Sequence, residues 1–208
     1  MVVLHYTGME TFEAAVDRLC DPSAEVSAHY LIDDEGAVLP LVDEPMRAWH
    51  AGAGAWGDVE DVNSRSIGIE LANKGPDSDA PAFPPAQMSA LEELLGGIMS
   101  RWAIPAERVI GHSDMAPGRK VDPGPYFDWP RLAGRGLAIW CDPQIAEVNV
   151  DVFRQSALAF GYRPPNGDWE KVLAAFRLRF RPGAEGPLDG VDTGTMAALA
   201  AQWPCATT

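Results

Sequence analysis

The sequence predicts an α/β domain followed by a small C-terminal bundle of three helices. In the N-terminal part, short apolar and β-branched runs alternate with amphipathic helical stretches, a pattern typical of α/β domains. From Ile145 onward the strand pattern disappears, and three helical stretches remain between segments rich in Gly and Pro. We therefore expect a boundary near residues 135–142, with domains at residues 1–138 and 139–208.

The first half of the α/β part is expected to contain a strand, a helix and a hairpin. Residues 2–4 form an apolar run that places His5 at the end of a strand. Apolar residues then recur at helical spacing over residues 12–19, and an Asp-Pro pair ends this pattern. The segment "SAHYLIDDEGAVLPLV" supplies two short strands around a turn at residues 33–36.

The second half of this part adds two strands and a long helix. The segment "SIGIELAN" alternates apolar and polar positions, which predicts a strand with Glu70 on one face. Two prolines then open a helix whose apolar stripe continues to Trp102, and "RVIGH" is a short strand that ends at His112. Since ligand-binding residues gather at strand ends and adjoining loops, His5, Glu70 and His112 are candidates.

Three helices are expected in the C-terminal part, at about residues 145–160, 168–180 and 192–203. The middle helix has an apolar face, and Asp168 is placed to cap its N-terminus. The segments "GYRPPNG" and "RPGAEGPLDG" separate the three, because their prolines and glycines interrupt a helix.

Composition narrows the classes of function. The net charge of −14 disfavours a nucleic-acid binder, because phosphate binding requires a positive field. No apolar run approaches the roughly 20 residues of a membrane-spanning helix, and the start lacks a signal-peptide pattern. The three cysteines are odd in number and widely spaced, which favours free thiols in a reducing compartment. We expect a cytoplasmic monomer, or a periplasmic protein if a leader is missing from this chain.

A charged loop follows the last strand. The segment "GHSDMAPGRKVDPGP" concentrates charge among prolines and glycines, so it should not continue as a regular helix or central strand. A catalytic zinc ion usually takes three histidine or carboxylate ligands and keeps one position open. His5, His112 and Asp122 could supply such a set, with Glu70 and Lys120 nearby. The alternative is that these histidines are structural, since the spacing forms no local zinc motif.

Five segments resemble, in the same order, those of the zinc-dependent N-acetylmuramoyl-L-alanine amidases of the Amidase_2 family, in its AmpD- and AmiD-like group. They are "VVLHYTGM", "SAHYLIDDEG", "RAWHAG", "SIGIELAN" and "GHSDMAPGRKVDPGPYFDW", and they span about residues 2–132. Farther on, "FGY", "AFRLRFRP" and "LDGVDTGTMAAL" resemble the three-helix peptidoglycan-binding module of the AmiD-like branch. The resemblance implies a mixed central sheet flanked by helices, as in peptidoglycan-recognition proteins.

The resemblance also implies a catalytic site. It assigns His5, His112 and Asp122 as zinc ligands, Glu70 as the catalytic acid and base, and Lys120 as the cation that stabilises the transition state. In this reading the zinc ion activates water and polarises an amide carbonyl, and Glu70 transfers the proton of that water to the departing amine. Lys120 faces the developing oxyanion.

Substrate-binding residues are also expected near this site, because muropeptides are anionic and this domain is acidic. The candidates are His29, Arg47, Trp49, His50, Arg65 and Arg119. The arginines could bind a stem-peptide carboxylate, or they could pair with surface aspartates. The two histidines could line the cleft, support a metal ligand or be packed structural residues. Trp49 and Trp56 could form a wall against the substrate, or they could be buried in the core.

The leading hypothesis is an amidase that hydrolyses the bond between N-acetylmuramic acid, in its 1,6-anhydro form, and L-alanine in peptidoglycan recycling. A periplasmic amidase acting on intact peptidoglycan is one alternative. A non-catalytic peptidoglycan-recognition protein is another. A thiol hydrolase using Cys20 or Cys141 is a third.

Overall fold

A mixed five-stranded sheet forms the centre of the α/β part. The computed structural model describes residues 1–77 and 82–205. The strands in these residues are β1 (Val2–Tyr6), β2 (Tyr30–Ile32), β3 (Val38–Pro40), β4 (Ile67–Leu71) and β5 (Val109–Gly111). They lie in the order β3-β2-β4-β1-β5, and only the hairpin partners β2 and β3 are antiparallel. The predicted α/β fold with a mixed central sheet is confirmed.

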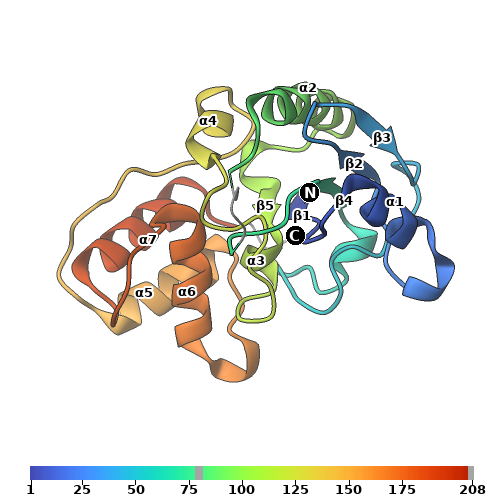
Figure 1. The fold of residues 1–208 in the computed structure, drawn as a ribbon. Coiled ribbons are helices and arrows are strands. Elements are labelled where there is room, and N and C mark those ends of the chain that lie inside the picture. The colour runs from blue at the N-terminus through green and yellow to red at the C-terminus, as the bar shows by residue number, and fades with distance from the viewer. Residues whose placement is uncertain (78–81, 206–208) are drawn as a thin grey trace.

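Seven α-helices lie within residues 1–77 and 82–205. They are α1 (Phe12–Cys20), α2 (Pro85–Trp102), α3 (His112–Met115), α4 (Trp129–Gly134), α5 (Val150–Phe160), α6 (Trp169–Phe180) and α7 (Gly190–Gln202). Figure 1 shows α5, α6 and α7 grouped beside the sheet, which confirms the predicted helical bundle. None of the helices in the described part of the chain is long and apolar enough to span a bilayer.

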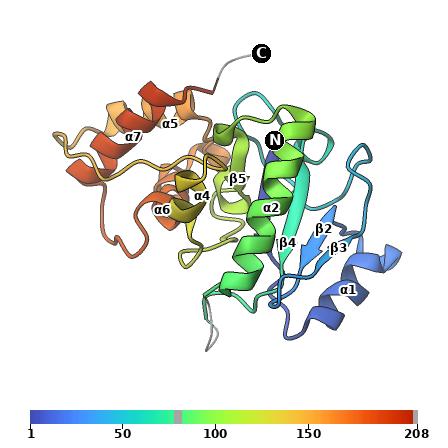
Figure 2. The same cartoon turned by 90° about the horizontal axis from the view of Figure 1, so that it is seen from above.

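The long helix α2 covers one face of the sheet (Figure 2). Its residues Leu91 and Leu95 are fully buried, in one cluster with Leu4 of β1 and Ile69 of β4. Side chains alternate between the two faces of a strand, so the neighbours of these strand residues point to the opposite face. His5 and Glu70 are therefore directed away from α2.

The helical bundle packs against this opposite face. One hydrophobic cluster contains Val3 of β1 and Ile110 of β5 together with buried residues of all three bundle helices. Trp56, from the loop before β4, packs edge-to-face against Phe160 and Tyr162, with ring centroids 5.4 Å and 5.1 Å away. Trp56 therefore belongs to the shared core, and it does not form a wall of a substrate cleft.

A buried polar cluster also joins the bundle to the α/β part. Asp114 of α3 is fully buried and accepts hydrogen bonds from the Tyr162 hydroxyl (2.7 Å), from Arg179 Nη1 (2.8 Å) and from the Gly111 amide (2.8 Å). The Arg179 guanidinium also lies 3.9 Å from the ring centroid of Trp129. Since α3 begins at His112, this cluster fixes the helix that carries a predicted metal ligand.

Two elements differ from the sequence prediction. The first bundle helix begins at Val150 and not near Ile145, because the Asn149 side chain caps it by accepting from the amides of Asp151 and Val152, both at 3.0 Å. The segment before it lies against the start of α7, where a Cβ on Gly194 would stand 2.4 Å from the Gln144 carbonyl oxygen. The charged loop after β5 was expected to be irregular, but it begins with a single helical turn, α3. The short helix α4 was not predicted from the sequence.

Candidate metal centre

Three strand ends bring the predicted reacting residues to one edge of the sheet. His5 of β1 is paired in register with Glu70 of β4, and His112 directly follows β5. Because β1, β4 and β5 are parallel, their carboxyl ends meet at the same edge. The loop after α3 returns Asp122 to this edge, where its carbonyl accepts a hydrogen bond from the Ser113 amide (2.9 Å).

Three ligand atoms form a small triangle at this edge. His5 Nδ1 lies 2.9 Å from His112 Nδ1 and 2.9 Å from Asp122 Oδ2, and His112 Nδ1 lies 3.0 Å from the same oxygen. The exposed fractions of the three residues are 1%, 3% and 7%, so the cluster is shielded from bulk water. Residues far apart in the sequence thus converge on one point, as a metal site requires.

The second nitrogen of His112 shows where that ring carries its proton. His112 Nε2 lies 2.8 Å from the Ala51 carbonyl oxygen. Arg119 Nη2 lies 3.3 Å from the same nitrogen, but the carbonyl contact is shorter, and a carbonyl oxygen only accepts, so the proton is assigned to Nε2. In this tautomer Nδ1 carries a lone pair directed at the other two ligand atoms. Arg119 donates to the same carbonyl from the solvent side.

The electrostatics of the triangle favour bound cations. Burial and the neighbouring His112 lower the pKa of His5 to about 4, although Asp122 acts in the other direction. Burial tends to raise the pKa of Asp122, but its contacts with the His112 and His5 rings outweigh burial and bring that pKa below its usual value. At neutral pH, Asp122 is therefore a carboxylate and the His5 ring is neutral, which suits both groups to binding a cation.

These residues fit a zinc ion. Two imidazole nitrogens and one carboxylate oxygen are common zinc ligands, and three such ligands leave the fourth position open. Bonds of about 2.0–2.2 Å in tetrahedral geometry separate ligand atoms by about 3.4 Å. The observed edges of 2.9 Å to 3.0 Å need to widen by only a few tenths of an ångström.

Glu70 lies beside the triangle and is chemically distinctive. Its Oε2 is buried and has no hydrogen-bond partner among the residues that the structure describes. Burial, together with the negative charge of Asp122, raises the pKa of Glu70 to about 8, and Lys120 partly opposes this shift. A carboxyl group with an unengaged oxygen and a pKa near neutrality is suited to proton transfer.

The triangle opens into a cavity of about 360 Å³. His5, His112 and Asp122 line it, as do Glu70 and the exposed Lys120. All five residues predicted for the catalytic site therefore face one cavity.

Four of the six predicted substrate-binding residues lie at or near this cavity. Trp49, which is 48% exposed, and Arg119 line it directly. Arg47 lines an adjoining hollow of about 340 Å³ that shares Trp49, Arg119 and Lys120. Arg47 Nη2 also forms an exposed ion pair with Asp61 (3.1 Å), which is the alternative that the sequence left open.

His50 is the fourth residue at the cavity, and the other two candidates, His29 and Arg65, are absent from its lining. His50 lines the cavity, and its Nδ1 lies 3.0 Å from His5 Nε2, so it contacts a predicted ligand. His29 does not line the cavity: its ring accepts from the Gly68 amide at 2.9 Å and lies 3.0 Å from the Met46 carbonyl oxygen, as in a structural residue. Arg65 is exposed and is also absent from the cavity lining.

Several residues that line the cavity were not singled out in the sequence, and two of them have side chains suited to substrate contact. Tyr6 follows His5 directly, and Arg18 projects from α1. The spacing of α1 contains a signal for Arg18, because Arg18 and Leu19 follow Ala15 by three and four residues, and all three line the cavity. Arg18 therefore adds a positive charge to the cavity lining.

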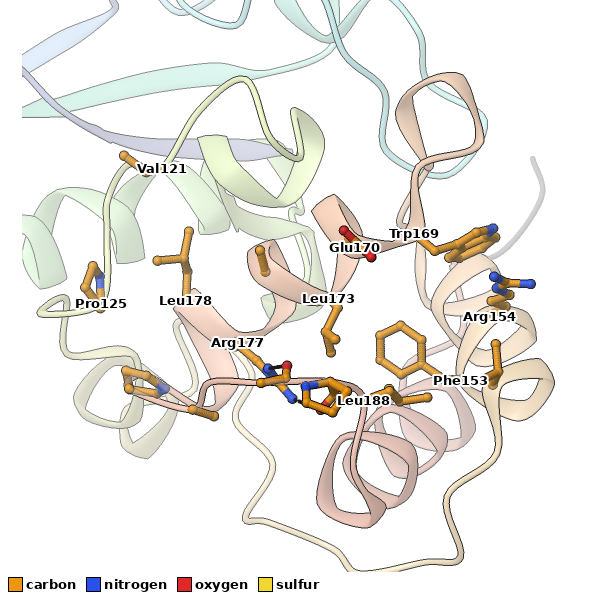
Figure 3. A pocket seen from close by; sticks show the side chains of 17 residues that line it. Val121, Pro125, Phe153, Arg154, Trp169, Glu170, Leu173, Arg177, Leu178 and Leu188 are labelled. Atoms are coloured by element: carbon orange, nitrogen blue, oxygen red, sulfur yellow. Dashed lines mark hydrogen bonds between the residues drawn. The ribbon is translucent and has the colours of Figure 1, made fainter.

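A larger cavity of about 880 Å³ lies in the helical bundle (Figure 3). Its lining is mainly apolar and includes Phe153 and Leu173, and Val121 of the charged loop borders it. The Arg154 guanidinium stands 5.5 Å from the ring centroid of Trp169 at one end of this cavity. Its lining as described contains no His, Cys or Asp, whereas all five residues predicted for the catalytic site line the smaller cavity.

Comparison with known proteins gives a consistent set of relatives. A family model described as N-acetylmuramoyl-L-alanine amidase (Amidase_2) matches residues 1–125. N-acetylmuramoyl-L-alanine amidase AmiD of Escherichia coli strain K12 is 35% identical, over 88% of this chain and 75% of its own length. The 1,6-anhydro-N-acetylmuramyl-L-alanine amidase AmpD of Haemophilus influenzae is 43% identical, over 63% of this chain and 79% of its own length.

A solved structure extends the similarity to both parts of the chain. Escherichia coli AmiD in complex with its substrate anhydro-N-acetylmuramic acid-L-Ala-D-gamma-Glu-L-Lys has a TM-score of 0.86 and 31% sequence identity. The match covers 97% of this chain and 88% of that chain, so the helical bundle is included.

Proposed function

The chain belongs to the N-acetylmuramoyl-L-alanine amidase family, and we propose that it hydrolyses the amide bond between 1,6-anhydro-N-acetylmuramic acid and L-alanine in muropeptides. Membership of this family confirms the prediction of an amidase. The choice of the anhydro sugar is supported by the names of AmpD and of the ligand bound to AmiD. The observation that carries the proposal is the triangle of His5, His112 and Asp122 beside Glu70.

We propose that His5 Nδ1, His112 Nδ1 and Asp122 Oδ2 hold a zinc ion. The support is the convergence of three buried ligand atoms within 3.0 Å of one another. When bound, zinc supplies Lewis-acid polarisation of the scissile carbonyl and activation of water near neutral pH. The buried surroundings of the triangle strengthen these electrostatic effects by excluding bulk water.

Glu70 is the proposed proton carrier. In its ionised form, which a pKa of about 8 leaves as the minor form at neutral pH, the carboxylate accepts a proton from the attacking water as the oxygen of that water bonds to the carbonyl carbon. The same group then gives the proton to the L-alanine nitrogen as the carbon–nitrogen bond breaks. The unengaged Oε2 is available for both transfers. General acid–base catalysis of this kind contributes about 10²–10⁴ to a rate.

Cations around the cavity are proposed to offset the acidity of the chain. Lys120 stabilises the developing oxyanion with its fixed charge, and it lies two residues from a proposed ligand. Arg18 and Arg119 are placed to bind carboxylates of the stem peptide at the same cavity. Local positive charge thus attracts an anionic substrate to a chain whose net charge is −14.

The helical bundle is proposed to bind the peptidoglycan polymer. Its cavity combines an apolar floor with Trp169 and Arg154, side chains that can stack on a sugar ring and contact an acidic group (Figure 3). Binding of this kind favours the alternative substrate, intact peptidoglycan. Retention of the full chain by insoluble sacculi, lost in a Trp169→Ala variant, supports this role, and equal retention of both contradicts it.

A cytoplasmic monomer is the proposed form of the protein. All three cysteines are free thiols, as expected in a reducing compartment, and the cavity is complete within one chain. The periplasm is the alternative. Fractionation of cells that produce the natural protein separates the two, since recovery in the periplasmic fraction contradicts the cytoplasmic assignment.

The experiment that tests the function compares soluble anhydro-muropeptides with intact sacculi, using the wild type and Glu70→Gln. The wild type is expected to release L-alanine-terminated peptides, and Glu70→Gln to keep its zinc and lose most of its activity. Full activity of Glu70→Gln contradicts the assigned proton carrier. A zinc-free wild type that binds muropeptides without cleaving them supports a recognition protein instead. Inhibition by a thiol-alkylating reagent and not by a chelator supports a thiol hydrolase.

A further inference from the structure

His50 lies directly behind His5, on the side away from the proposed metal. His50 Nδ1 is 3.0 Å from His5 Nε2, and the two rings meet edge-to-face with centroids 5.1 Å apart. His50 is only 8% exposed. A Cβ at position 68 would stand 2.3 Å from the His50 ring, so Gly68 provides the space that this ring occupies.

The hydrogen bonds of Ser66 fix the protons of both rings. The Ser66 hydroxyl donates its one proton to the Val62 carbonyl oxygen, so it can only accept from His50 Nε2 at 3.2 Å. Nε2 of neutral His50 therefore carries the proton, and Nδ1 accepts. His5 Nε2 is then the donor in the contact between the two histidines, and His5 Nδ1 is left with a free lone pair facing the triangle.

Ala51, which follows His50, orients the second histidine of the triangle, His112. The Ala51 carbonyl oxygen accepts from His112 Nε2 at 2.8 Å, which leaves His112 Nδ1 unprotonated. Asn63 anchors this segment, because its Oδ1 accepts from the amides of His50 (3.1 Å) and Ala51 (2.8 Å). Residues 50 and 51, which the Asn63 side chain anchors, thus contact Nε2 of both histidines in the triangle.

We propose that residues 50 and 51 form a brace for both histidine ligands, and that His50 and Ser66 are positioning residues that present His5 Nδ1 to the metal in its unprotonated tautomer. This inference rests on the proposed function, because it requires a metal at the triangle. Partners that orient a metal-bound histidine typically change metal affinity by about 10–100-fold when they are removed.

Zinc affinity of the full chain, measured by competition with a chromophoric chelator, tests the brace. His50→Leu removes the acceptor for His5 and is expected to weaken zinc binding about 10–100-fold. His50→Gln keeps an acceptor oxygen and should recover part of the loss. Gln87→Leu is the matched control, since it also replaces a buried polar residue, one that donates to the Ile32 and Ala72 carbonyl oxygens and not to the triangle, and its zinc affinity should equal that of the wild type. Wild-type affinity in His50→Leu overturns the inference.

A second pair of variants covers the case in which His50→Leu does not fold. Ser66→Ala removes only the hydroxyl that orients His50, whereas Ser66→Thr retains it. Ser66→Ala is expected to weaken zinc binding, and Ser66→Thr to stay near the wild type. In ¹⁵N spectra of the zinc-bound protein, the proton on His5 Nε2 should be observed in the wild type, and it should exchange with water faster in Ser66→Ala. An unchanged spectrum and affinity in Ser66→Ala overturn the inference.

These results are separable from failure of the proposed function. If the wild type and His112→Ala both fail to bind zinc, the triangle is not a zinc site. The proposed brace is then contradicted as well. If the wild type binds zinc, His112→Ala does not, and the His50 and Ser66 variants bind as tightly as the wild type, then only the brace is wrong.

Discussion

At the scale of single residues, the site depends on which face of a strand each side chain occupies. The apolar alternation in β4 directs Ile69 to α2 and Glu70 to the other face, and the pairing with β1 places His5 beside it. The sequence pattern was sufficient to predict this part of the site, because alternation and strand ends are local properties. The contact between His50 and His5 could not be predicted, because it depends on the path of a glycine-rich loop that Asn63 anchors.

Lys120 gives a prediction at this scale. Lys120→Ala should retain stoichiometric zinc and KM close to the wild-type value, and should lose about 10²–10³ in kcat, because its charge acts on the developing oxyanion. Steady-state kinetics on a soluble anhydro-muropeptide, with metal analysis of the same sample, provide the measurement. Lys74→Ala is the control, as it removes a lysine whose Nζ pairs with the Glu10 carboxylate outside the cavity. An equal effect of both variants contradicts a specific role for Lys120.

At the scale of elements, Glu44 joins the last turn of α2 to the loop after β3. Its carboxylate accepts hydrogen bonds from Arg101, Trp102 and the Tyr30 hydroxyl, the last at 2.8 Å. The hydrogen bond from Arg101 is the main cause that lowers the pKa of Glu44 to about 2, against the effect of burial. Sequence periodicity predicted α2 correctly, but this long-range contact at its end has no local signal.

Glu44→Gln is therefore expected to destabilise the protein in a pH-dependent way. A lowered pKa means that the carboxylate contributes stability above its usual value of 4.5, and that this contribution is lost as the pH falls toward about 2. Because Arg101 is 53% exposed and screened by solvent, the expected loss at pH 7 is only about 1 kcal/mol. Urea unfolding of both proteins between pH 7 and pH 2.5 measures it. A difference that stays constant across this range contradicts the account, and Glu10→Gln, at an 84% exposed carboxylate, should show little effect.

The start of the bundle shows why element boundaries were harder to predict than elements. The composition of residues 145–149 is compatible with a helix, but this segment instead runs along α7, where the Ala146 amide donates to the Gly190 carbonyl oxygen at 2.9 Å. Gly190 and Gly194 permit this approach. A Cβ on Gly190 would lie 2.4 Å from the Ala146 carbonyl oxygen, and a Cβ on Gly194 would lie 2.4 Å from the Gln144 carbonyl oxygen. A tertiary contact, and not local propensity, decides where α5 begins.

At the scale of the whole molecule, the bundle and the α/β part share one core. The predicted domains at residues 1–138 and 139–208 meet in a cluster that includes Trp56 and in the polar contacts of Asp114. The sequence predicted both parts but not the contact between them. The local sequence around each contacting residue is that of an ordinary core or surface position and does not identify its partner. The α3 turn that carries His112 is consequently held by Tyr162 and Arg179 of the bundle.

Arg179→Met tests this connection. It leaves the Asp114 carboxylate buried without its cation, which should cost about 3–5 kcal/mol. The double variant Asp114→Asn/Arg179→Met removes the uncompensated charge and should recover much of that loss. Calorimetry of the full chain should show a single unfolding transition in the wild type, because the two parts share a core. Two separate transitions in the wild type, or no penalty for Arg179→Met, contradict the coupling.

Two histidines and one aspartate from separate strand ends and loops are proposed to hold one zinc ion. X-ray absorption spectroscopy of the purified full chain, with metal analysis, identifies the donors of that ion. We expect one zinc ion per chain with only nitrogen and oxygen donors at about 2.0–2.2 Å, and loss of that ion in Asp122→Ala. A chain without stoichiometric zinc, or a sulfur donor at about 2.3 Å, would contradict it.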